Sequence, residues 1–182
     1  FSQMKKFKGL LLVALVLIPS TCFGAAEIQA VRAKTAVKID GQLSDACWQT
    51  AQPITEFIRY GTKHPSDSKT FGYLAYDDSY IYIAVNCLDP DPGNIKASIS
   101  GRHDERVLDD DCVEIMVDPG RTQERYFQFV VGAGGGTFDV ARTRAGAGED
   151  DDWQGSWESA ASVNDAGWSV ELAIPYGALQ IT

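Results

Sequence analysis

The side chains best suited to chemistry are carboxylates gathered in one stretch of the chain. Asp109, Asp110 and Asp111 run directly into an alternating segment that carries Glu114 and ends at Asp118, just before a proline. Clustered carboxylate oxygens suit hard cations such as calcium. A single carboxylate among other polar groups suits hydrogen bonds to the hydroxyl groups of a ligand.

A strand over residues 112–118 would position these carboxylates. Alternation places Val113 and Ile115 on one face of this strand and Glu114 with Met116 on the other. Glu114 fits either a solvated sheet face or a face that meets a ligand, and the segment alone leaves the two readings open.

The next alternating segment brings further polar groups to the same face. Residues 125–131 place their two phenylalanines on the apolar face, so Tyr126 and Gln128 share the polar face with Glu114. The sequence thus predicts a polar surface across two neighbouring strands.

The rest of the chain predicts an all-β fold. Alternating segments separated by turn residues recur at near-regular intervals, and only one short helical segment interrupts them. The expected strands are 27–33, 36–39, 54–60, 69–76, 80–88, 112–118, 125–131, 137–143, a strand ending at 163, and 168–174, with a helical piece over 45–51.

Several burial predictions follow from the same alternation. Trp168 is expected in the core, and Trp48, on the helical piece, is expected to be buried as a plug at one end of the core. In segment 80–88 the isoleucines face the core, while Tyr80 and Tyr82 alternate with them and face outward or toward an edge. The glycine-rich stretch 132–136 lacks the context of a nucleotide loop and predicts a mobile turn.

The first 25 residues predict an export signal rather than part of the fold. A basic segment over 4–8 precedes an apolar run over 9–19, and small residues follow. The apolar run is too short for a stable membrane anchor. Residues 1–3 stand ahead of the methionine as extra leading residues, and lipid attachment at Cys22 stays open beside plain secretion. We therefore expect a periplasmic, extracellular or envelope-associated protein that does not span a membrane.

Composition narrows the partners of the remaining domain, residues 26–182. The chain has 16 basic and 25 acidic residues, and the signal takes three lysines, which leaves 13 basic residues against the same 25 acids. Such a charge argues against nucleic acid as a partner. Cys47, Cys87 and Cys112 allow one disulfide at most, with small buried hydrophobic residues as the favoured reading. The chain has two histidines and no Ser/His/Asp set at the spacing of a known motif, so it offers few candidates for a catalytic base.

Four blocks in order resemble a known family. They are Lys38-Ile39-Asp40-Gly41-Gln42-Leu43-Ser44-Asp45 with Trp48 following, Leu74-Ala75-Tyr76-Asp77-Asp78-Ser79-Tyr80-Ile81-Tyr82, Asp111-Cys112-Val113-Glu114-Ile115-Met116-Val117-Asp118, and Gly167-Trp168-Ser169-Val170-Glu171-Leu172-Ala173-Ile174-Pro175. In this order and spacing they resemble carbohydrate-binding module family 9 domains, which are related to the DOMON sandwiches. The resemblance implies a two-sheet antiparallel β-sandwich that is non-catalytic and often stabilised by calcium, with no organic cofactor.

The resemblance also implies a sugar site. In sugar-binding members a terminal sugar lies between two tryptophans, and polar side chains bond its hydroxyls. Glu114 matches the motif glutamate and Gln128 a neighbouring polar contact, and the expected site further includes Tyr126, Arg106 and Trp153. Trp153 is interpreted either as a substitute stacking platform or as an edge residue that covers the end of the sandwich.

Two departures from the family pattern bear on that site. Leu108 lies about where the first tryptophan is expected, and the C-terminal strands of the family, with the second tryptophan, are expected to be missing after residue 182. Possible cation ligands are Asp89, Asp91, Asp109, Asp110 and Asp111.

Three functions are consistent with the sequence. The first is a secreted module that binds a glycan or terminal sugar and forms part of a longer, glycoside-hydrolase-associated protein in carbohydrate catabolism, with a downstream domain. The second is a structural domain of an envelope protein that lacks a sugar site, which Leu108 favours. The third and most remote is a haem b domain with Met116 and His103 as axial ligands.

Overall fold

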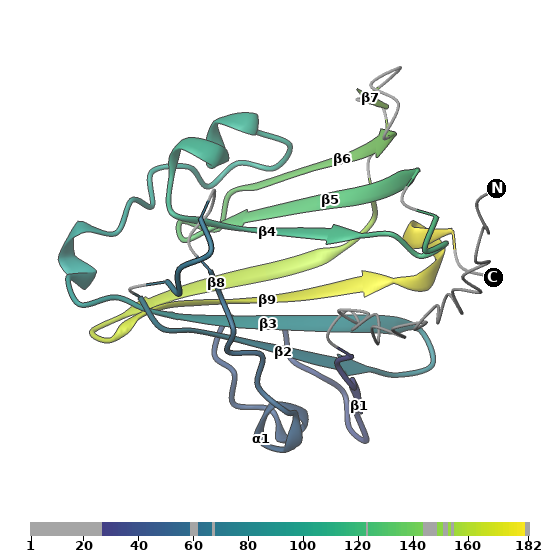
Figure 1. Ribbon diagram of the computed structural model, residues 1–182, viewed down its shortest axis with the longest axis horizontal. Helices are drawn as coiled ribbons and strands as arrows, with labels where there is room; N and C mark the ends of the chain where they lie inside the picture. The colour runs from purple at the N-terminus through teal and green to yellow at the C-terminus, as the bar shows by residue number, and fades with distance from the viewer. Residues whose placement is uncertain are drawn as a thin grey trace, which may run out of the picture.

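The computed structural model describes residues 27–58, 62–66, 68–122, 124–143, 149–150, 153 and 155–180. Two β-sheets form a sandwich (Figure 1). The five-stranded sheet has the order β1-β2-β3-β9-β8 and the four-stranded sheet the order β4-β5-β6-β7, and all pairs are antiparallel except β1 with β2. The all-β, two-sheet prediction is confirmed.

The elements are as follows. The five-stranded sheet contains β1 (Val31–Arg32), β2 (Thr70–Tyr76), β3 (Tyr80–Leu88), β8 (Glu158–Asn164) and β9 (Gly167–Pro175). The four-stranded sheet contains β4 (Cys112–Val117), β5 (Arg125–Gly132), β6 (Thr137–Thr143) and β7 (Glu149–Asp150). The helices are α1 (Ala46–Thr50) and the 3-10 turns η1 (Pro92–Asn94), η2 (Glu105–Asp109) and η3 (Tyr176–Leu179).

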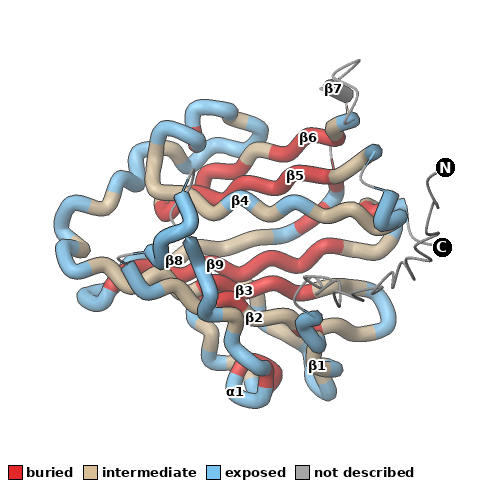
Figure 2. The backbone as a smooth tube through the Cα atoms, viewed as in Figure 1, coloured by how far each residue is buried: buried red, intermediate tan, exposed pale blue. Residues whose placement is uncertain are grey.

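The main core lies between the two sheets. It is built from every second residue of β3, β5 and β9, as the alternation predicts, and Figure 2 shows these strands as the most buried part of the sandwich. Phe129, Leu172 and Ile174 have no exposed surface, and Trp168 is buried as expected. The strands on this core therefore carry their other side chains to the two outer faces.

A second hydrophobic cluster covers the outer face of the five-stranded sheet. α1 and the chain before it place Trp48 and Cys47 over Ala75, Tyr82 and Ala173. Tyr82 lies on the outer face of the sheet, as its alternation with the isoleucines predicts, but this layer covers it and leaves only 6% of the residue exposed. Trp48 is buried, as predicted.

Glu171 anchors this second layer from the middle of β9. Its carboxylate is fully buried and accepts hydrogen bonds from Asp40 N at 3.0 Å, Gly41 N at 2.8 Å and Trp48 Nε1 at 2.7 Å. A buried carboxylate is tolerated when such donors satisfy it. One side chain thereby fixes both the turn before α1 and the tryptophan of α1.

The N-terminal part forms less strand than predicted. Segment 27–33 contributes only Val31 and Arg32 to a sheet, and 36–39 runs as irregular chain beside α1. Within the described part of segment 54–60, pairing is limited to isolated bridges at Ile54 and Ile58. Apart from β1 and these bridges, the described residues of the three segments lie beside the sheet without pairing, so tertiary packing outweighs their local strand preference.

The glycine-rich turn between β5 and β6 is held in place, contrary to the expected mobility. Gly136 N donates to Ile99 O at 3.0 Å, and a Cβ atom at Gly134 or Gly136 would lie within 2.7 Å of a carbonyl oxygen in the chain that crosses over them. The glycines permit this close approach of two backbones.

The three cysteines of the described chain are free thiols. Burial raises the pKa of Cys87 to about 11 and that of Cys112 to about 11. Both thiols therefore stay protonated at neutral pH, which agrees with the interpretation of these cysteines as small packing residues.

The structure bears on the membrane prediction only within the described residues, and the export prediction concerns residues 1–25. Among the described residues, no helix is long and apolar enough to cross a membrane. The predicted export signal and Cys22 lie outside the described residues.

Asp77 at the β2–β3 turn makes the stability of the fold depend on pH. Burial alone would raise the pKa of Asp77, but the N–H groups of Ser79 and Tyr80 and the hydroxyl of Tyr82 donate to its carboxylate at 2.7–2.9 Å and lower it overall. A depressed folded-state pKa stabilises the fold above the unfolded pKa, near 4, and that stabilisation is lost as pH falls through the folded pKa.

We therefore expect Asp77→Asn to lower the melting temperature at pH 7 and to approach the wild type as the pH falls toward 3. Thermal unfolding followed by circular dichroism across this range checks the prediction. Asp165→Asn, in the exposed β8–β9 turn, is the matched control and should not change the pH profile. A gap between Asp77→Asn and the wild type that is constant from pH 7 to pH 3 would contradict the assignment.

Candidate functional site

A chain of polar side chains crosses the outer face of the four-stranded sheet. Glu114 on β4, Gln128 on β5 and Arg142 on β6 all lie on the face opposite the main core. Gln128 Nε2 donates to Glu114 Oε2 at 3.0 Å, and Arg142 Nε donates to Gln128 Oε1 at 2.6 Å. The structure thus brings two of the three polar residues that the sequence predicted for one face, Glu114 and Gln128, into direct contact and adds Arg142.

This hydrogen-bond chain fixes the orientation of the central amide. Only one orientation of Gln128 points its NH₂ at a carboxylate and its oxygen at a guanidinium. Gln128 is 5% exposed, whereas Glu114 is exposed and Arg142 is half-buried. The amide therefore acts as a positioning residue that holds an exposed carboxylate at one end and a half-buried guanidinium at the other.

The neighbours of this chain give the face its mixed character. Tyr126 is half-buried and lies opposite Arg142 in the β5–β6 ladder. Met116 lies opposite Gln128 and is 60% exposed. The surface presents carboxylate, guanidinium and phenol groups beside an apolar side chain, a combination that can bond hydroxyls and contact C–H surface at once.

The turn η2 closes one end of the outer face. A Cβ atom at Gly132 would lie 2.6 Å from Val107 Cγ2, so η2 packs directly on the end of β5, and Val107 has no exposed surface. Leu108, on the same turn, is 36% exposed. Arg106 is exposed and is bound to Asp104 through Nε at 2.9 Å and Nη2 at 2.6 Å, so it lies at this end of the face without joining the Glu114 chain.

Trp153 does not lie on this face. Its ring packs against Phe127, with ring centroids 4.8 Å apart, and against Phe129, on the inner side of the four-stranded sheet. Of the two interpretations of Trp153, the structure supports the edge residue that covers the end of the sandwich. The expected pairing with Glu114 as an exposed stacking platform is wrong, because the sheet separates the two side chains.

The predicted cation ligands do not assemble into one site. Asp110 and Asp111 each accept a backbone N–H at 2.7 Å, from Ile99 and Lys96. Asp89 accepts from Asp91 N at 2.7 Å, and Asp91 accepts from Asn94 Nδ2 at 2.6 Å, while Asp109 is exposed. Within the described residues no three His, Cys, Asp or Glu side chains lie together as a metal ion would require. The acids as arranged fit loop capping rather than calcium binding.

The proposed haem ligands lie on opposite sides of the four-stranded sheet. Met116 is on the outer face, while His103 Nδ1 lies 2.9 Å from Asp139 Oδ1, and Asp139 is opposite Phe129 on the inner side. His103 and Met116 therefore cannot bind one iron as a pair, and the haem prediction is not supported.

Arg142 is the site residue that the sequence analysis missed. Segment 137–143 alternates like its neighbours, and Arg142 falls on the same face as Gln128 once the register of β5 and β6 is known. Alternation in this segment groups Arg142 with Phe138 and Val140, a set that predicts an apolar face, and only the register places Arg142 beside Gln128.

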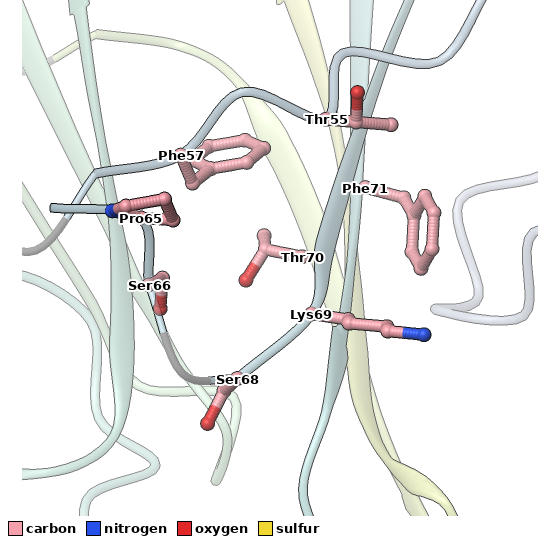
Figure 3. A pocket seen from close by; sticks show the side chains of 8 residues that line it. All are labelled: Thr55, Phe57, Pro65, Ser66, Ser68, Lys69, Thr70 and Phe71. Carbon is pink, nitrogen blue, oxygen red and sulfur yellow. The ribbon is translucent and has the colours of Figure 1, made fainter.

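A separate depression of about 330 Å³ lies beside the start of β2. Phe57 and Pro65 lie on one side of the strand and Phe71 points to the other (Figure 3). This pocket contains none of the residues predicted for the sugar site.

Comparisons with known proteins agree with this architecture. A profile of the family described as "Carbohydrate family 9 binding domain-like" matches residues 39–182. A family 9 carbohydrate-binding module from Caldicellulosiruptor kristjanssonii is similar in its complex with glucose, with TM-score 0.57, 18% identity, and coverage of 82% of this chain and 69% of that chain. Its complex with cellotriose gives TM-score 0.54, 18% identity, and coverage of 82% and 67%.

A candidate carbohydrate-binding protein from Bacteroides uniformis is also similar, with TM-score 0.63, 16% identity, and coverage of 84% of this chain and 74% of that chain. A search of curated proteins finds no match. At these identities the solved structures show a shared fold, whereas the family profile covers most of the sequence. The chain belongs to the carbohydrate family 9 binding domain-like family.

Proposed function

We propose that this chain is a non-catalytic module that binds the end of a neutral glycan at the outer face of the four-stranded sheet. The observation that carries the proposal is the Glu114–Gln128–Arg142 hydrogen-bond chain, which holds an exposed carboxylate and a half-buried guanidinium on one face of the sheet. The similar module from Caldicellulosiruptor kristjanssonii, solved with glucose and with cellotriose, supports a sugar as the ligand.

The chemistry of the face suits neighbouring hydroxyl groups of a pyranose. A carboxylate accepts hydrogen bonds from hydroxyls and a guanidinium donates to them, and charge-assisted bonds of this kind are stronger than neutral ones. Leu108 and Met116 supply apolar surface at 36% and 60% exposure. A charged pair that is already oriented also lowers the ordering cost of binding.

Glycan binding should depend on Glu114. We expect Glu114→Ala to reduce binding on a glycan array by about tenfold or more, because one or two charge-assisted hydrogen bonds and the partner of Gln128 are lost. Glu158→Ala, at an exposed acid on β8, is the matched control and should bind as the wild type does. Equal binding by Glu114→Ala and the wild type would contradict the site.

A structural role without sugar binding is the second candidate, and Leu108 in place of an aromatic side chain is the observation that favours it. Absence of binding by the wild type to every glycan on the same array would support that role. In the leading proposal the chain is exported and serves a longer, glycoside-hydrolase-associated protein in carbohydrate catabolism. The predicted export signal over residues 1–25 supports the export part of this proposal.

A further inference from the structure

The opposite side of the sandwich carries a second polar surface that the Glu114 site does not use. A pocket of about 420 Å³ lies on the outer face of the five-stranded sheet. Its polar lining consists of Gln42, Ser44, Asn86, Ser162, Asn164 and Ser169. A neighbouring pocket of about 380 Å³ shares Leu43 and Asn86 with it, so the two form one groove, which we call the outer groove.

The floor of the outer groove follows the sheet register. Asn86 on β3 is opposite Ser169 on β9, and Ser169 is opposite Ser162 on β8. Adjacent strands lie about 4.8 Å apart, so these three side chains form a row roughly 10 Å long. Within the described part of the chain, the side chains of Asn86 and Ser162 make no hydrogen bond, which leaves an amide and a hydroxyl at the floor for a ligand.

The wall of the outer groove is rigidly anchored. The Gly41–Ser44 turn forms this wall, and the buried Glu171 holds its start through Gly41 N at 2.8 Å. Ser169 Oγ donates to Gly41 O at 2.6 Å. Gly41 has φ +79°, and a Cβ atom there would lie 2.7 Å from the backbone of Ala161. The turn is thus pressed onto β8, and the groove exists before any ligand arrives.

The chemistry of the lining selects an uncharged ligand. Among the residues that the structure describes, no lysine, arginine, aspartate or glutamate lines either pocket, although charged residues make up 23% of the chain. Phosphate groups would find no cation here. A peptide could not insert as a strand on the floor of the groove, because β3, β9 and β8 already pair with one another there. Neutral amides and hydroxyls beside Leu43 and the half-buried Tyr73 suit the hydroxyls and C–H surface of a saccharide.

We propose that the outer groove is a second saccharide-binding site, separate from the Glu114 site, that takes an internal stretch of an unbranched neutral glycan. An open groove lets a chain enter and leave at both ends. Two sites on opposite sheets would let one module contact two glycan chains at once, which would increase its overall affinity for a glycan surface through avidity.

The test uses the Glu114→Ala protein, in which binding at the first site is weakened. Isothermal titration calorimetry would measure binding of cellohexaose, xylohexaose and mannohexaose to this protein and to the same protein with Asn86→Ala or Ser162→Lys added. Ser100→Lys, the same kind of change on an exposed loop, is the matched control. A neutral serine–glycine peptide forms a separate arm.

We expect Glu114→Ala to keep weak binding of at least one hexasaccharide, and each groove variant to reduce that binding by about tenfold, the effect of losing one to two hydrogen bonds. Ser162→Lys lies on the edge strand β8 and tests the groove even if Asn86→Ala is unstable. No hexasaccharide binding by Glu114→Ala, unchanged binding by both groove variants, or binding of the peptide alone would each overturn the proposal. None of these results bears on the loss of binding caused by Glu114→Ala itself.

Discussion

Replacing Glu171 with alanine is expected to lower the free energy of unfolding by about 3–5 kcal/mol, because buried donors left without an acceptor cost about 1–3 kcal/mol each. The substitution leaves Asp40 N, Gly41 N and Trp48 Nε1 without their acceptor. Small domains are stable by only about 5–15 kcal/mol in total. The change therefore removes a large part of the stability of the fold from a position on the sheet opposite the Glu114 site.

Urea unfolding followed by tryptophan fluorescence measures this effect, and Glu158→Ala on the neighbouring strand is the control. An exposed acid such as Glu158 should change stability by less than about 0.5 kcal/mol. We further expect the Trp48 indole N–H resonance to move, since its hydrogen bond to Glu171 is lost. A loss of stability below about 1 kcal/mol with an unchanged indole resonance would contradict the anchoring role of Glu171.

Leu108→Trp is expected to increase sugar affinity by about tenfold. Leu108 lies on η2 at the closed end of the face, is 36% exposed, and occupies the position where the family resemblance implies a tryptophan. An indole that buried about 60 Å² of pyranose surface would contribute roughly 1.5 kcal/mol. Titration of both proteins with glucose and cellotriose checks the prediction.

Leu108→Met is the matched control for this gain, because it keeps the size and apolar character of the side chain without an aromatic ring. It should bind sugar as the wild type does. If Leu108→Trp folds normally and binds no more tightly than Leu108→Met, η2 does not border the sugar site and the placement of the ligand is wrong.

The central strands were predictable because their alternation reflects burial on one face. β3, β4, β5, β6 and β9 lie within a few residues of the predicted segments. The same alternation placed Glu114, Tyr126 and Gln128 on one face, which the sheet register confirms. Their role in sugar binding stays a prediction.

What the sequence could not reveal was which outer faces are covered. Tyr82 and Glu171 alternate with core residues and so predict exposure, yet the layer of α1 and the preceding chain buries both. The contacts responsible join residues far apart in the chain, as between Gly41 and Glu171. For the same reason the sequence left two interpretations of Trp153 open, since a tryptophan in a polar loop gives no local sign that it packs on Phe127.

The central claim is that the Glu114–Gln128–Arg142 chain contacts the sugar. The most direct test is a titration of ¹⁵N-labelled protein with cellotriose, followed by the side-chain resonances of Gln128 Nε2 and Arg142 Nε. Gln128 Nε2 donates to Glu114 Oε2 at 3.0 Å, and Arg142 Nε donates to Gln128 Oε1 at 2.6 Å. A sugar that bonds Glu114 or Arg142 must therefore change the surroundings of both N–H groups. We predict that both resonances shift in a saturable way, together with backbone amides of β4 and β5. Binding of cellotriose that leaves both side-chain resonances unchanged would contradict the account.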